Sequence, residues 1–206
     1  MFISFEGPEG AGKTTAIRAL ADRLVAEGHA VRVTKEPGEG ETGRRIREIL
    51  LHGDALEPYA ELFLFLADRT EHVQKFIRPW LTAGDVVLCD RYADSTLVYQ
   101  VHGRGLDREF VEAANARAVD GLWPDRTILL DLPPDVGLAR LQERDRIDAA
   151  PIEFHRRVRD GFLELAQREP RRFAIVNADG PPGMVHSAIW EVVADHFARA
   201  ERNAIE

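Results

Sequence analysis

Residues 7–14 have the types and the spacing that bind phosphate, because they set three glycines before a lysine and a threonine in the order GPEGAGKT. The glycines allow consecutive backbone N–H groups to turn inward around a phosphate. Lys13 can then reach the outer phosphates of a nucleotide, and the Thr14 hydroxyl can ligate magnesium. An apolar run at residues 2–5 precedes the loop and apolar residues at helical spacing follow it. A chance match is the alternative, but a loop at a helix N-terminus favours anions, so we predict nucleotide binding here.

A second chemical feature is the turn Asp90-Arg91-Tyr92, which follows the apolar run at residues 86–89. An acidic residue at the end of a parallel strand, close to a phosphate loop, can hold hydrated magnesium. The guanidinium of Arg91 can bind a phosphate through paired hydrogen bonds. The structural alternative is a solvated Asp–Arg pair at a strand end. Because the glycine-rich loop is present, we favour a metal and phosphate site.

The predicted helix over residues 57–82 carries a third feature, Phe65 followed by Arg69 one helical turn later. Together they could clamp a nucleobase by stacking and hydrogen bonding, although Phe65 taken alone is more often an ordinary core aromatic. The pair flanks a stripe that we expect to face the core, because its members fall on one helix face. That stripe consists of Tyr59, Leu62, Phe63, Leu66, Val73, Phe76, Ile77 and Trp80.

These residues require a scaffold of alternating strands and helices. Strands are predicted over residues 2–5, 30–34, 86–89, 127–132 and 173–176. Helices are predicted over residues 14–27, 43–52, 57–82, 107–120, 135–144, 151–168 and 184–203. Such alternation predicts an α/β fold with a parallel five-stranded sheet covered by helices on both faces. Ligands of such sheets bind beyond the carboxyl ends of the strands, where both the loop and the Asp90 turn lie.

Composition narrows the class of protein. The chain has 206 residues, and we expect one domain over residues 1–206. Its net charge of −8 argues against non-specific nucleic-acid binding and against a basic membrane surface. No secretory signal or membrane span is visible, and the single Cys89 lies in an apolar run, so we expect a buried thiol and a cytoplasmic protein. The seven histidines lack ligand spacing, so no zinc site is predicted.

The chain resembles bacterial thymidylate kinases, which belong to the nucleoside monophosphate kinases, over nearly its whole length. The resemblance rests on FEGPEGAGKTT, TKEPG, ELFLFLADRTEHV, DRYADSTLVYQ, RGL and VNAD. It implies a P-loop kinase fold with a short mobile lid, and the reaction ATP + dTMP → ADP + dTDP with Mg²⁺. It also implies a homodimer. Three residues depart from the family pattern: Lys35 in place of arginine, Glu39 in place of glycine and Val98 in place of alanine.

The resemblance also implies roles for individual residues. Those expected around ATP are Gly7, Pro8, Glu9, Gly10, Ala11, Gly12, Lys13, Thr14, Thr15 and Arg140. Those expected around dTMP are Glu9, Glu36, Arg47, Phe65, Arg69, Arg91, Thr96, Tyr99 and Gln100. Glu9 would face the sugar 3′-hydroxyl, Glu36 the reacting phosphates, and Arg47 and Arg91 the dTMP phosphate. Phe65 would stack on thymine, Arg69 would donate to its exocyclic oxygen, and Tyr99 would disfavour ribose. Thr96 and Gln100 would read the rest of the base, and Thr14 and Asp90 would hold the metal.

A charge for the transferring phosphate must also be found, because the glycine-rich loop contains no arginine. The run at residues 140–146 contains Arg140, Arg144 and Arg146 and resembles the family's lid, expected at about residues 140–151. We expect Arg144 or Arg146 to act there, beside Lys13, Glu9, Glu36 and Arg91. A solvated basic helix end is the alternative reading of this run.

Two other functions are compatible with parts of this pattern. One is a kinase for a different small acceptor, which an acceptor panel would distinguish. The other is a GTPase-like switch, which would need an N-K-x-D guanine motif. Residues 177–179 read NAD, and they lack the lysine and the spacing of that motif.

Overall fold

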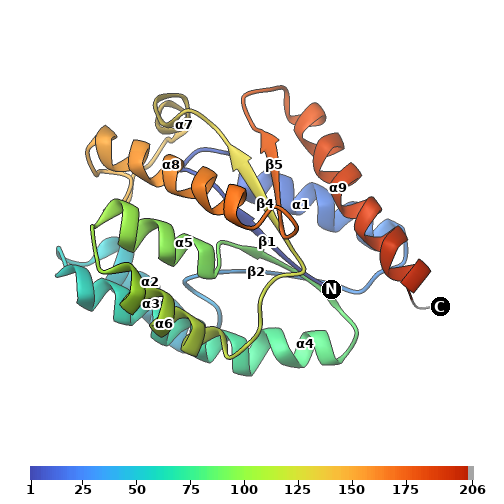
Figure 1. Ribbon diagram of the computed structural model, residues 1–206, viewed down its shortest axis with the longest axis horizontal. Helices are drawn as coiled ribbons and strands as arrows, with labels where there is room; N and C mark the ends of the chain where they lie inside the picture. Colours follow the sequence, from blue (N-terminus) through green and yellow to red (C-terminus); the bar gives the residue numbers. More distant parts are fainter. Residues whose placement is uncertain (204–206) are drawn as a thin grey trace.

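The computed structural model describes residues 1–203, so residues 204–206 of the expected domain lie outside the described part of the chain. Five parallel strands form one sheet in the order β2-β3-β1-β4-β5 (Figure 1). Their bounds are β1 Phe2–Glu6, β2 Val31–Lys35, β3 Val86–Asp90, β4 Arg126–Asp131 and β5 Phe173–Asn177. The five predicted strands and the parallel α/β sheet are therefore confirmed.

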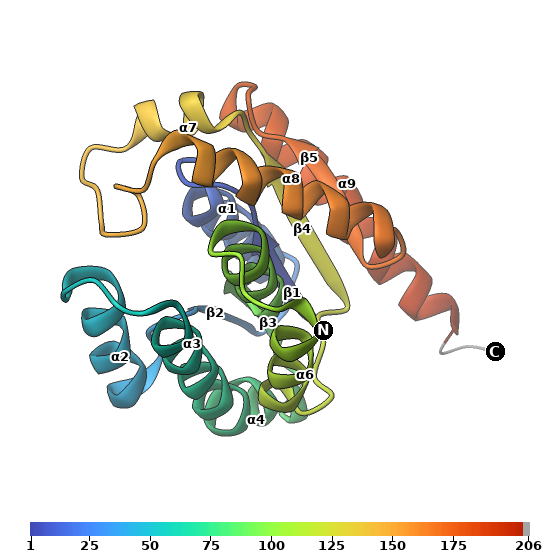
Figure 2. The same cartoon turned by 60° about the vertical axis from the view of Figure 1, so that its left-hand side comes forward.

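The helices around this sheet agree with most of the predicted ranges. The α-helices are α1 Lys13–Ala26, α2 Gly40–His52, α3 Pro58–His72, α4 Arg78–Thr82, α5 Ala93–Leu97, α6 Arg108–Val119, α7 Pro134–Arg140, α8 Ile152–Arg168 and α9 Pro182–Asn203. Two π-helical stretches, η1 Val73–Ile77 and η2 Val98–Gly103, continue α3 and α5. Figure 2 shows α2, α3, α4 and α6 gathered apart from α8 and α9.

Side chains alternate along the buried strands, and among the described residues they pack into three apolar clusters, one on one face of the sheet and two on the other. On one sheet face, Ile3, Phe5 and Ile128 pack with apolar residues of α1 and α9. On the other face, Leu129 packs with apolar residues of α2, η2 and α8, and Phe2 packs with apolar residues of η1, α5 and α6. Helices on both faces bury the central strands β1, β3 and β4, and the loops at the carboxyl ends of the strands carry the polar residues.

Three local predictions were wrong. The segment at residues 93–103 is helical, although no helix was predicted there. The helix predicted over residues 135–144 ends at Arg140, and residues 141–151 form turns and irregular chain up to α8. Tyr59 and Phe63 were expected in the core, but they are 44% and 53% exposed. Helical spacing places residues on a shared face, whereas only packing decides what covers that face.

Two simpler expectations can be compared directly with the structure. Cys89 is fully buried on β3, as predicted for a thiol within an apolar run. Within residues 1–203, none of the helices combines the length and apolar character that crossing a bilayer requires.

Candidate active site

The glycine-rich loop connects β1 to α1, as its sequence predicts. Gly12 precedes α1 in a left-handed conformation, and no side chain caps the helix, so the first-turn N–H groups face the loop. The Lys13 ammonium donates to the carbonyl oxygens of Gly7 and Pro8 at 3.0 and 2.9 Å. Burial, helped by the Arg91 charge, lowers the pKa of Lys13 to about 8 against the opposing effect of Asp90. A cation held this way is available to a phosphate that enters the loop.

The predicted metal ligands lie side by side. The Thr14 hydroxyl donates to Asp90 Oδ2 at 2.9 Å, at the carboxyl end of β3. A hydroxyl and a carboxylate next to a phosphate loop are hard oxygen donors, and Mg²⁺ typically takes one or two such protein ligands with water and phosphate completing its shell. The residues present therefore fit a magnesium ion that arrives with a nucleotide.

Arg91 and Glu9 form an ion pair where the two loops meet. Arg91 Nη2 donates to Glu9 Oε1 at 2.9 Å, and the Tyr99 hydroxyl donates to the same oxygen. The backbone φ of Arg91 is 67°, a left-handed value that costs energy for a non-glycine residue and is concentrated at functional sites. Burial alone would raise the pKa of Glu9, but Arg91, His155, Lys13 and Tyr99 together lower it to about 2. Glu9 is therefore ionised around neutral pH and places a negative charge beside the loop.

Two adjoining clefts meet at this ion pair. The loop-side cleft is lined by the phosphate loop, including Lys13 and Thr14, and by Asp90. The helix-side cleft is lined by Phe65, Arg69, Tyr92, Ser95, Thr96, Tyr99 and Gln100, among others. Five residues line both clefts: Glu9, Glu36, Arg47, Arg91 and Asp148. A group bound in one cleft can therefore reach a group bound in the other across two arginines.

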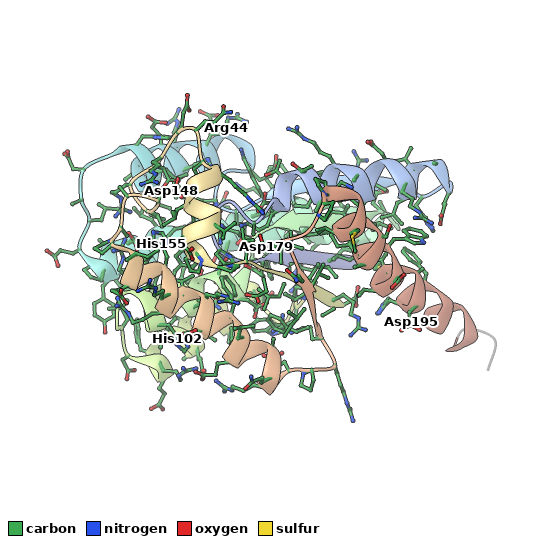
Figure 3. All side chains as sticks on the ribbon, turned by 90° about the horizontal axis from the view of Figure 1, so that it is seen from above. Arg44, His102, Asp148, His155, Asp179 and Asp195 are labelled. Atoms are coloured by element: carbon green, nitrogen blue, oxygen red, sulfur yellow. The ribbon has the colours of Figure 1, made fainter. Side chains whose placement is uncertain are left out.

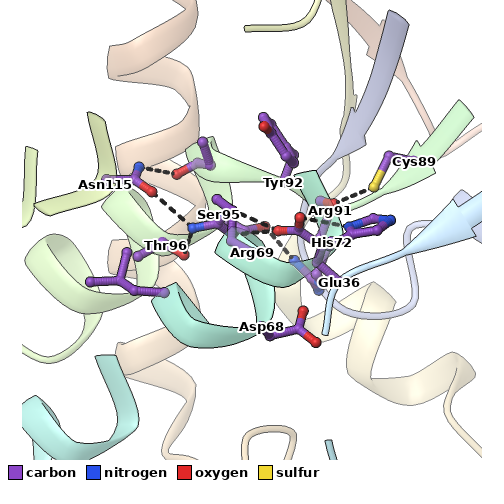
Figure 4. A network of polar contacts seen from close by, with 12 residues as sticks. Glu36, Asp68, Arg69, His72, Cys89, Arg91, Tyr92, Ser95, Thr96 and Asn115 are labelled. Carbon is purple, nitrogen blue, oxygen red and sulfur yellow. Dashed lines mark hydrogen bonds and ion pairs between the residues drawn. The ribbon is translucent and has the colours of Figure 1, made fainter. Parts of the chain in front are cut away.

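Arg69 is held from several directions (Figure 4). Its Nε donates to Glu36 Oε2 at 2.8 Å, and its Nη1 donates to Thr96 Oγ1 and Asn115 Oδ1, both at 2.8 Å. Its Nη2 lies 2.7 Å from Glu36 Oε2 and has a second N–H for a ligand. The contact of Arg69 with a base stays a prediction, and the structure adds that the guanidinium is already fixed in one plane.

Glu36 occupies the predicted place but is less free than expected. It lines both clefts and is only 4% exposed. One carboxylate oxygen accepts from Arg69, and the other lies 2.8 Å from His72 Nδ1. Its role over the reacting phosphates stays a prediction, while its contacts show that it orients Arg69.

The lid arginines have three different environments. Arg140 ends α7 and donates to Ala178 O at 3.2 Å, beside the loop at residues 177–179. Arg144 is exposed and donates to Leu138 O at 3.3 Å. Arg146 is turned away from the loop-side cleft: its Nη2 donates to Glu61 Oε2 at 2.6 Å and its Nε to Leu50 O at 2.9 Å. Their catalytic roles are untested, but these contacts favour Arg144 over Arg146.

Sequence reasoning missed several residues of the site. Asp148 lines both clefts from the lid segment, and His155 of α8 is fully buried with Nδ1 3.4 Å from Glu9 Oε2. Figure 3 shows Asp148 and His155 at the same end of the molecule, close to the start of α8. Glu61, His72 and Asn115 line neither cleft, but they contact the lining residues Gln100, Glu36 and Arg69, respectively. Only His72 had a local signal, one helical turn after Arg69; the others depend on contacts between distant segments.

Comparison with known proteins agrees with this geometry. The family model described as thymidylate kinase matches residues 5–189. The chain is 53% identical over 193 residues to a thymidylate kinase of Synechococcus sp. (strain JA-2-3B'a(2-13)), covering 94% of each chain. It is 50% identical over 206 residues to that of Thermomicrobium roseum, covering 98% of each. The crystal structure of thymidylate kinase from Ehrlichia chaffeensis superposes with a TM-score of 0.79 at 33% identity, covering 94% of this chain and 98% of that chain. The chain belongs to the thymidylate kinase family.

Proposed function

We propose that this protein transfers the terminal phosphoryl group of ATP to dTMP, giving ADP and dTDP for the synthesis of dTTP and DNA. The observation that carries the proposal is the junction of the two clefts. Arg47 and Arg91 line both the loop-side cleft, which contains Lys13, and the helix-side cleft, which contains Phe65. Membership of the thymidylate kinase family supports the choice of substrate.

The donor side is built from the loop and the end of β3. Backbone N–H groups at the start of α1 and the Lys13 ammonium bind the ATP phosphates. Thr14 and Asp90 would hold the magnesium ion, which neutralises charge on the phosphates during transfer. Arg140, next to the loop at residues 177–179, extends this side toward the nucleoside of ATP.

The acceptor side is the helix-side cleft. Arg47 and Arg91 bind the dTMP phosphate, and Phe65 stacks on thymine. Tyr99, whose hydroxyl donates to Glu9, would crowd a ribose 2′-hydroxyl and so disfavour ribonucleotides, and Glu9 would face the sugar 3′-hydroxyl. The acceptor oxygen is already ionised near neutral pH, because the second pKa of a phosphate monoester is about 6. Catalysis therefore needs positioning and charge neutralisation rather than a general base.

The lid supplies the remaining charge. Arg144 is exposed, lies in the irregular segment between α7 and α8, and has one hydrogen bond to a carbonyl, which closure can exchange for a phosphate. Arg146, in contrast, is held in an ion pair with the buried Glu61. We assign closure onto the transferring phosphate to Arg144.

A second copy of the chain is the proposed partner. Tyr59, Phe63 and Phe110 form an exposed aromatic cluster on α3 and α6, with ring centroids 5.7 to 6.3 Å apart. Exposed aromatic side chains that pack together at the surface are characteristic of protein interfaces. We propose that this aromatic cluster lies in the homodimer interface.

We also place this enzyme in the cytoplasm. The single cysteine, Cys89, is buried and free, and burial raises its pKa well above the usual value. A lone unreactive thiol is compatible with a reducing compartment, where the nucleotide substrates are also found.

The decisive experiment is an ADP-release assay with a panel of acceptors: dTMP, dUMP, dCMP, dGMP and AMP. We expect dTMP to give the highest kcat/KM and dCMP to be strongly rejected, because a hydrogen-bonding pocket excludes a base with the wrong donors. Lys13→Ala should lower kcat by at least about a hundredfold. If another acceptor gave the highest kcat/KM, that acceptor and not dTMP would be the substrate. If no acceptor led to ADP release, the proposal that the protein is a kinase would be refuted.

A further inference from the structure

A buried carboxylate, Glu61 in the first turn of α3, joins three distant segments. It is 2% exposed. Its Oε1 accepts from Gln100 Nε2 at 2.7 Å and from Arg104 Nε at 3.0 Å. Its Oε2 accepts from Arg104 Nη2 at 3.1 Å and from Arg146 Nη2 at 2.6 Å. One carboxylate thus contacts η2, the chain that follows it, and the lid segment.

The contact with Glu61 determines which way the Gln100 amide points. A carboxylate bound by two arginines accepts hydrogen bonds and cannot donate one, so only the amide nitrogen of Gln100 can face it. The amide oxygen must then face away from Glu61. Gln100 is fully buried and lines the helix-side cleft, and its Oε1 has no hydrogen-bond partner among the described residues. An acceptor without a partner is costly unless a ligand donates to it.

The orientation of this amide has a consequence for base selection. Thymine carries an N–H group at N3, whereas cytosine carries a bare acceptor nitrogen there. If Gln100 Oε1 faces the base, it accepts from the N3–H of thymine and repels the bare N3 of cytosine. A reversed amide would present its N–H group instead, which would favour cytosine over thymine. Reversal is prevented because it would bring Oε1 against the Glu61 carboxylate, acceptor to acceptor.

We infer that Glu61 is a positioning residue that sets the donor and acceptor sense of Gln100 and thereby makes the cleft select an imide base. The inference rests on the proposed function, since it concerns the base of the acceptor nucleotide. Glu61 does not line the cleft, so it acts through Gln100 rather than by contact with substrate. Because Arg146 shares Glu61, the base of the lid is anchored to the carboxylate that orients this amide.

The test replaces Glu61 by its neutral isostere and measures the ratio of kcat/KM for dTMP to that for dCMP. In Glu61→Gln the new amide can donate to Gln100 Oε1, so Gln100 can reverse. We expect the ratio to fall by at least about tenfold, since a pocket built for one hydrogen-bond pattern loses discrimination when that pattern is lost. The dissociation constants of dTMP and dCMP, measured by calorimetry, should converge in parallel.

The matched control is Arg104→Ala, which removes an ion pair to Glu61 but leaves the Glu61–Gln100 contact. It should lower the melting temperature while the dTMP to dCMP ratio stays within about twofold of the wild type, because the amide keeps its partner. If Glu61→Gln lowers kcat/KM for both nucleotides in equal proportion, Glu61 is merely structural and the inference is overturned.

If Glu61→Gln alone does not fold, it is combined with Arg104→Ala, which removes one of the two arginines that a neutral side chain would leave unpaired. An unchanged ratio in that double variant would refute the inference. If the wild type itself shows no preference for dTMP over dCMP, the proposed function fails, and this result is visible before any variant is made.

Discussion

The backbones of Gly10 and Gly137 touch: a Cβ atom added to Gly10 would lie 2.0 Å from Gly137 O. Gly10 belongs to the phosphate loop and has a left-handed φ of 69°, and Gly137 lies within α7, just before the lid. Gly137 is equally close to the residue before Gly10, since a Cβ on Gly137 would lie 2.1 Å from Glu9 O. The phosphate loop, which is expected to bind ATP, therefore packs directly against α7, the helix that precedes the lid.

Gly137→Ala should displace the phosphate loop. A methyl group 2.1 Å from a backbone oxygen cannot be accommodated without movement, so Glu9 and Gly10 must shift. We expect ATP to bind at least about tenfold more weakly by calorimetry, because the loop N–H groups no longer converge. Gly183→Ala is the control, since a Cβ there meets nothing within 4 Å. Normal ATP affinity in Gly137→Ala would show that the loop tolerates the shift.

The affinity for ATP should fall as the pH rises above about 8. The pKa of Lys13 is about 8 in the free protein, lowered first by burial and then by Arg91. Phosphates favour the charged ammonium, so binding is strongest below that pH and takes up a proton near it. Calorimetry from pH 7 to 9.5 in two buffers measures both effects. Lys13→Arg, which stays charged, should show no such decline; a flat wild-type profile would contradict the assignment.

The lid arginines should separate kinetically. Arg144→Ala is expected to lower kcat by at least about a hundredfold with dTMP affinity nearly unchanged, because its contact forms mainly in the transition state. Arg146→Ala should instead lower the melting temperature, because it leaves Glu61 with a lost ion pair in a buried site. Steady-state kinetics and thermal unfolding distinguish the two. If Arg146→Ala lowered kcat and Arg144→Ala did not, the catalytic role would belong to Arg146.

The aromatic cluster should control the oligomeric state. Phe63→Glu and Phe110→Glu place charges where two exposed rings now pack, so we expect the dimer to dissociate in sedimentation experiments. Met184→Glu is the matched control, because Met184 of α9 is 69% exposed and lies on another element. A dimer that withstands both phenylalanine changes would place the interface elsewhere.

Local sequence was enough for the framework and for the loops at its edge. The strands follow from short apolar runs, and the phosphate loop follows from glycine spacing between a strand and a helix; both signals lie within a few residues of one another. Thr14 and Asp90 are distant in sequence, but a parallel sheet still makes their proximity predictable, because β1 and β3 bring their carboxyl ends to one edge.

Only the tertiary structure decided which partners the charged side chains of the site have. Arg69 is bound by Glu36, Thr96 and Asn115, and Arg146 by Glu61, which lies 85 positions earlier in the chain. Residue types show that an arginine can bind a phosphate, a base or a carboxylate, but not which of them is near. The exposure of Phe63 could not be predicted for a similar reason, because periodicity defines a helix face but not whether another element packs against that face. The physical reason is that charge pairing and burial depend on distances between segments, and these exist only once the chain has folded.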